Sequence, residues 1–60
     1  MLTARINAAA PWLGWFTVEE LAREVKAPVD ALAMELVFAE DRGDAEIREA
    51  GNGLEYRFPA

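Results

Sequence analysis

The chain has 60 residues, a formal net charge of -5 and neither cysteine nor histidine. A chain of this length forms one domain, here residues 1–60, and buries only about 60% of its extended-chain surface. The missing residue types exclude disulfides and thiolate metal sites and remove the usual general base. The negative charge opposes binding to a phosphate backbone, which normally depends on several lysines and arginines.

Enzymes and membrane proteins are also not expected. The sequence has no serine, cysteine or histidine for a nucleophile–base pair and no glycine-rich phosphate loop, so we expect neither catalysis nor a bound cofactor or small-molecule substrate. The acidic stretch 40–49 lacks the regular spacing of a Ca²⁺ loop. The apolar stretch 8–16 is much shorter than a membrane span and is interrupted by Pro11 and Gly14. We therefore expect a soluble, cytoplasmic protein.

A first helix is predicted over about residues 3–10. Thr3 is a residue type that caps helices, and Pro11 lacks the amide hydrogen that would continue the backbone hydrogen bonds. The spacing therefore predicts a short helix that ends before the proline.

Three aromatic residues follow this helix within five positions. So many large rings cannot stay in water on so small a domain, so we expect most of Trp12, Trp15 and Phe16 to fill the core. Trp15 and Phe16 are also candidates for a short strand. Stacking of nucleic-acid bases on Trp12, Trp15 or Tyr56 is not favoured, because no basic residues flank them in the pattern that such a site needs.

The best-defined helix start lies at Thr17. Thr17 and Glu20 have the spacing of a capping box, and Phe16 and Leu21 have the spacing of a hydrophobic staple. A second helix is therefore predicted over about residues 18–25, with a turn at 26–27. Its predicted core face consists of Val18, Leu21, Ala22 and Val25.

A third helix is predicted over about residues 28–41, opened by Pro28 and stopped by Gly43 in a left-handed conformation. Its predicted core stripe consists of Val29, Leu32, Leu36 and Ala39. Met34 and Phe38 project from roughly the opposite side. Either they are further core, covered by another element, or they form an exposed apolar patch, which on a small domain usually marks an interface. We adopt the second interpretation.

The remaining residues alternate between apolar and charged side chains, which predicts a β-hairpin over about residues 45–58 with a turn at 50–53. Its apolar side, which we expect to face the helices, consists of Ala45, Ile47, Leu54, Tyr56 and Phe58.

Three helices followed by a two-stranded hairpin make a mainly α fold of the α+β class, in the order of a winged helix-turn-helix domain. The chain resembles the N-terminal domains of bacterial DeoR-type regulators from about residue 17 to 58, without insertion or deletion between Leu21 and Gly43. The matching positions are Leu21, Ala22, Arg23, Glu24, Val25, Pro28, Asp30, Leu32, Glu35, Leu36, Ala39 and Gly43. The resemblance implies that the helix over 28–41 would enter the major groove of DNA.

The outward positions of that helix depart from the family pattern, because they carry none of the basic or amide side chains that contact base edges. Asp30 and Glu35 would also face phosphates unfavourably. We therefore expect a small acidic winged-helix regulatory or assembly module that binds a protein partner, or a second copy of itself, through this helix. The expected interface consists of Ala31, Met34, Glu35, Val37 and Phe38.

Two alternatives remain open. The chain could be a DNA-binding transcription regulator whose phosphate contacts come from Arg23, Lys26, Arg42, Arg48 and Arg57. Nearby carboxylates make it more plausible that these cations are ordinary surface charge. The chain could also be an inhibitor encoded by a mobile element that binds a host protein, an interpretation that rests on charge and size alone.

Overall fold

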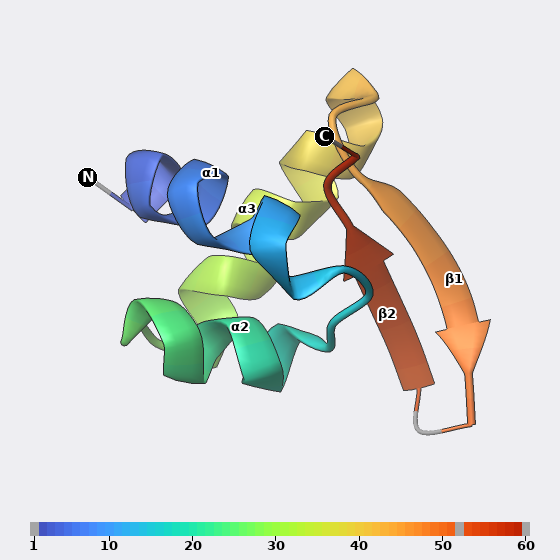
Figure 1. The fold of residues 1–60 in the computed structure, drawn as a ribbon, viewed down its shortest axis with the longest axis horizontal. Coiled ribbons are helices and arrows are strands. Elements are labelled where there is room, and N and C mark those ends of the chain that lie inside the picture. The colour runs from blue at the N-terminus through green and yellow to red at the C-terminus, as the bar shows by residue number, and fades with distance from the viewer. Residues whose placement is uncertain (1, 52, 60) are drawn as a thin grey trace.

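The protein consists of three helices, the third of which lies behind the first two in Figure 1, and an antiparallel hairpin beside them. The structure, a computed structural model, describes residues 2–51 and 53–59. Its elements are α1 (Leu2–Leu13), α2 (Val18–Val25), α3 (Val29–Arg42), β1 (Glu46–Ala50) and β2 (Gly53–Arg57). The predicted fold class is confirmed, and the order of elements is compatible with a winged-helix layout.

The start of α2 is as predicted. The Glu20 amide donates to the Thr17 hydroxyl oxygen at 3.2 Å, and the Thr17 amide donates to the Glu20 carboxylate at 2.7 Å. Phe16 and Leu21, the two residues of the expected staple, are both buried in the core. At the other end, Lys26 adopts the left-handed conformation with a φ of 57° and its amide donates to the Ala22 carbonyl. A local sequence signal therefore determines where this helix begins, whereas its end adopts a conformation that lysine rarely takes.

Removal of the Thr17 hydroxyl should measurably destabilise the fold. Thr17→Ala leaves an amide at the start of α2 without its acceptor, so we expect the free energy of unfolding to fall by about 1 kcal/mol in urea denaturation. Thr17→Ser keeps the hydroxyl and is the matched control. Equal losses in the two variants would show that the methyl group, and not the cap, is responsible.

Helix α1 is longer than predicted at both ends. Pro11 lies inside its last turn, and the helix ends at Leu13, before Gly14 with a φ of 66°. The proline removes one hydrogen bond, to the carbonyl of the solvent-exposed Asn7, while Leu13 continues the buried face of the helix. Thr3 is likewise not the cap, because the helix begins at Leu2.

This extension explains why the prediction for Trp12 was wrong. In a helix that turns by about 100° per residue, Trp12 lies about 120° from Ile6 and points away from the core. Its side chain is accordingly 89% exposed. Of the three aromatic residues, Phe16 is buried, as predicted, and Trp15 is only half-buried.

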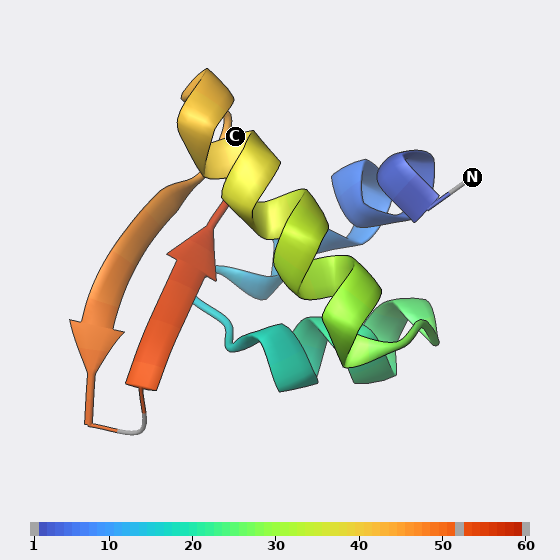
Figure 2. The same cartoon turned by 180° about the vertical axis from the view of Figure 1, so that it is seen from behind.

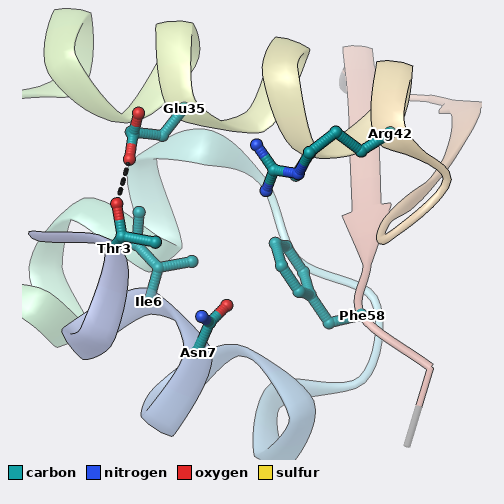
Figure 3. A pocket seen from close by; sticks show the side chains of 7 residues that line it. Thr3, Ile6, Asn7, Glu35, Arg42 and Phe58 are labelled. Carbon is teal, nitrogen blue, oxygen red and sulfur yellow. Dashed lines mark hydrogen bonds between the residues drawn. The ribbon is translucent and has the colours of Figure 1, made fainter.

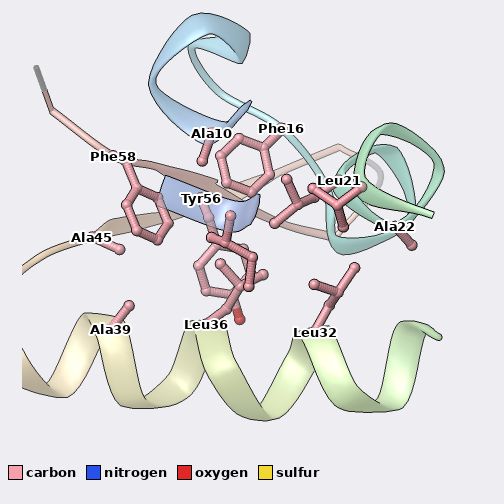
Figure 4. Packing of buried hydrophobic residues seen from close by; sticks show 12 residues of the cluster. Ala10, Phe16, Leu21, Ala22, Leu32, Leu36, Ala39, Ala45, Tyr56 and Phe58 are labelled. Carbon is pink, nitrogen blue, oxygen red and sulfur yellow. The ribbon is translucent and has the colours of Figure 1, made fainter. Parts of the chain in front are cut away.

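The core lies between α3 and the other elements. Figure 4 shows Leu32, Leu36 and Ala39 pointing from one side of α3 toward the buried rings of the hairpin and the loop before α2. The fourth residue of the predicted stripe, Val29, is 40% exposed, which contradicts its assignment to the core. Val29 lies on the same side of α3 as Leu32, but it is the first residue of the helix and lies past the end of the core.

Three of the five residues of the predicted apolar face of the hairpin, Ala45, Tyr56 and Phe58, are buried. Ile47 lies opposite Tyr56 in the antiparallel register, and Leu54 lies opposite Glu49. Tyr56 is buried, but Ile47 lies on β1, the strand farther from the helices, and Leu54 lies two residues nearer the hairpin turn than Tyr56, so both are about half exposed (Figure 1). Of the short strand predicted at Trp15 and Phe16, the structure has only an isolated bridge between Phe16 and Tyr56, with backbone N···O distances of 2.9 and 2.8 Å. Of the predicted turn at 50–53, Asn52 lies outside the described residues.

Candidate protein-binding surface

The outer side of α3 carries an exposed apolar stripe. Figure 2 shows α3 in front of α1 and α2, and Figure 1 shows it behind them, so its outer side faces away from the other helices. Met34 is 58% exposed, Val37 is 52% exposed and Phe38 is 50% exposed. Ala31, one turn before Met34, is also exposed. We call Ala31, Met34, Val37 and Phe38 the α3 stripe.

The periodicity of the helix places the stripe opposite the core. Leu36 is buried, while Met34 and Phe38, two residues on either side of it, lie about 160° around the helix from it. The alternative in which Met34 and Phe38 fill the core is therefore wrong. Because α3 is regular from Val29 to Arg42, its sequence alone determines which side chains face outward.

Carboxylates border the stripe. Asp30 and Asp41 are both exposed and precede and follow the stripe along the helix. Glu35, which we expected within the interface, is only partly exposed and accepts a hydrogen bond from the Thr3 hydroxyl at 2.7 Å. Glu35 therefore lies at the edge of the stripe that adjoins α1.

The five cations that were candidates for phosphate contacts do not lie together on α3. Arg42, at its end, is 3.0 Å from the Asp44 carboxylate. In the hairpin, Arg48 is 2.6 Å from Glu55 across the strands, and Arg57 pairs with Glu46. The other two, Arg23 and Lys26, are exposed on α2 and at its end. Three of the five are therefore engaged with carboxylates.

The outer face of the hairpin carries a second feature that the sequence did not reveal. The guanidinium of Arg48 lies 4.2 Å from the ring centre of Trp15, and that of Arg57 lies 4.9 Å from it. The ring of Trp15 therefore packs against two guanidinium groups on the hairpin and not within the core. The cross-strand charge pairs could have been found from the alternation of the hairpin, but the position of Trp15 depends on the bridge at Phe16.

Arg5 has a structural role that sequence reasoning also missed. Its guanidinium donates to the carbonyls of Val25 and Lys26. These carbonyls lie at the negative end of α2, where a cation is favourable. Arg5 therefore joins α1 to the C-terminal end of α2.

A small hollow lies between α1 and α3 (Figure 3). Thr3, Asn7 and Arg42 lie at its polar part, while Ile6 and Phe58 provide apolar walls. The space in it that a water-sized sphere can occupy is about 10 Å³, enough for one water molecule at most. The hollow is too small to enclose a ligand of ordinary size.

Comparisons with known proteins do not assign the surface. The chain matches no family model, no curated protein and no solved structure. Among the described residues, no helix has the length and apolar character needed to cross a bilayer. A function must therefore be argued from the surface itself.

Proposed function

We propose that this chain is a small winged-helix domain that acts as a regulatory or assembly module and binds a polypeptide through the α3 stripe. The observation that supports the proposal is the half exposure of Met34, Val37 and Phe38 side by side on one helix. Contiguous apolar side chains rimmed by charge are typical of interaction sites on small proteins. The resemblance to DeoR-type domains adds that this helix is the one with which such folds contact their target.

The energetics suggest a modest interaction. Full burial of a large apolar side chain gains roughly 1.5–3 kcal/mol. Because the three large residues of the stripe are about half exposed, each can still gain about half of this free energy when a partner covers it. About 2–4 kcal/mol of gross stabilisation is less than the cost of association that a complex must overcome. The stripe would therefore act as the apolar centre of a larger interface with polar contacts around it.

A DNA-binding role has weaker support. The net charge is -5, and the cations of Arg42, Arg48 and Arg57 already contact carboxylates. Titration of labelled duplex at about 50 mM salt would give micromolar or tighter binding with a steep salt dependence if phosphate contacts dominated. We expect no such binding.

Site-specific photocrosslinking tests the proposal in cells that produce the protein. With p-benzoylphenylalanine at position 38, we expect a discrete adduct that protease removes and nuclease does not. The matched control carries the same group at position 24, where Glu24 is exposed on α2 outside the stripe. Adducts that nuclease removes would contradict the proposal, and so would the same adducts at both positions.

A further inference from the structure

The two ends of the α3 stripe carry the same charge. Asp30 precedes Met34 by four residues and Asp41 follows Val37 by four, and both lie within about 50° of the middle of the stripe. Eleven residues of helix place these carboxylates about 16 Å apart along the axis. Among the described residues, neither forms an ion pair with a lysine or arginine.

This arrangement disfavours a second copy of the chain as the occupant. If two α3 helices packed antiparallel over their stripes, Asp30 of each copy would lie within about a turn of Asp41 of the other. If they packed parallel, each aspartate would face its own counterpart. In either orientation, carboxylates of the two copies come together at both ends of the interface. Such repulsion between like charges disfavours binding of a wrong partner.

The position of Asp41 is unfavourable for the isolated domain. It lies in the last turn of α3, where the helix dipole is negative and disfavours a carboxylate. Asp30, in the first turn, is at the favourable end. A cation of a partner at the C-terminal end of α3 would therefore offset the repulsion between the Asp41 carboxylate and the negative end of the helix dipole.

On the basis of the proposed function, we infer that the occupant of the α3 stripe is an amphipathic helix with a basic residue at each end of its own apolar stripe. The two basic residues would be about eleven positions apart, so that one reaches Asp30 and the other Asp41. Apolar side chains at helical spacing between them would pack on Met34, Val37 and Phe38.

A displayed library of helical peptides tests this inference. Each peptide has a fixed leucine stripe and, at each end, one position that encodes Lys, Glu or Gln. Selection on the folded protein should enrich Lys over Glu at both ends by about tenfold or more, with the preference reduced at high salt. The Phe38→Glu variant should no longer capture these peptides. Because position 38 is half exposed, circular dichroism should show that this variant is still folded.

Charge-neutral variants provide the matched comparison. The preference for Lys should be lost in the double variant Asp30→Asn, Asp41→Asn. It should remain in the control, Glu19→Gln with Glu24→Gln, which changes the net charge by the same amount at exposed positions on α2. Phe38-dependent capture without any preference for Lys would overturn the inference and leave the proposed function intact. A dimer in sedimentation that Phe38→Glu dissociates would identify a second copy as occupant and have the same consequence. Monomers with no Phe38-dependent capture would overturn both.

Discussion

Leu36→Ala is expected to remove most of the stability of this domain. Leu36 is completely buried and lies at the centre of the face that α3 presents to the core (Figure 4). Truncation of such a leucine costs about 2–5 kcal/mol, because apolar contacts are lost and a cavity remains. A 60-residue domain has only about 3–9 kcal/mol of stability in total, so the variant should be partly unfolded at room temperature. Urea denaturation followed by circular dichroism measures the loss.

Met34→Ala is the matched control for this variant. It removes the same number of side-chain heavy atoms from the same helix, two residues earlier, and methionine has nearly the helix propensity of leucine. Because Met34 is mostly exposed, we expect its loss to change the free energy of unfolding by less than about 0.5 kcal/mol. Similar losses in the two variants would show that the stripe is part of the core and would remove the basis of the proposed binding surface.

Residues whose position depends on local structure could be predicted from the sequence. The capping box at Thr17 and Glu20 determines where α2 begins, and the left-handed turn at Gly43 determines where α3 ends. Between such ends the helical period alone separates Leu36 from Met34 and Phe38. The exposed stripe on α3 could therefore be predicted from the sequence.

Residues whose position depends on tertiary packing could not be predicted. Pro11 is tolerated in α1 because the last turn of the helix packs Leu13 against the core. Rules based on neighbouring residues in the sequence do not include this stabilisation. The same extension turns Trp12 outward. Hydropathy likewise cannot show that β1 lies on the far side of β2 from the helices, which leaves Ile47 about half exposed, or that Leu54 lies beyond the buried part of β2.

The second large effect is expected for Phe16→Ala. Phe16 is almost completely buried, and its ring lies 6.4 Å from that of Tyr56 and 6.3 Å from that of Phe58, in stacked orientations. It is the link between the hairpin and the loop before α2, so its truncation should cost about 3–5 kcal/mol and loosen β2 in particular. Hydrogen exchange at the Tyr56 amide, which donates to the Phe16 carbonyl, should report this local loosening.

The comparison with Phe16→Leu decides what holds the hairpin in place. Both variants keep the two backbone hydrogen bonds between positions 16 and 56, but leucine keeps most of the buried volume that alanine removes. If ring packing fixes the hairpin, Phe16→Leu should lose less than about half as much stability as Phe16→Ala. Nearly unchanged exchange at Tyr56 in both variants would instead assign the attachment to the backbone bridge. The hairpin would then be held at its edge rather than by the core, and the aromatic cluster would be a consequence of its position.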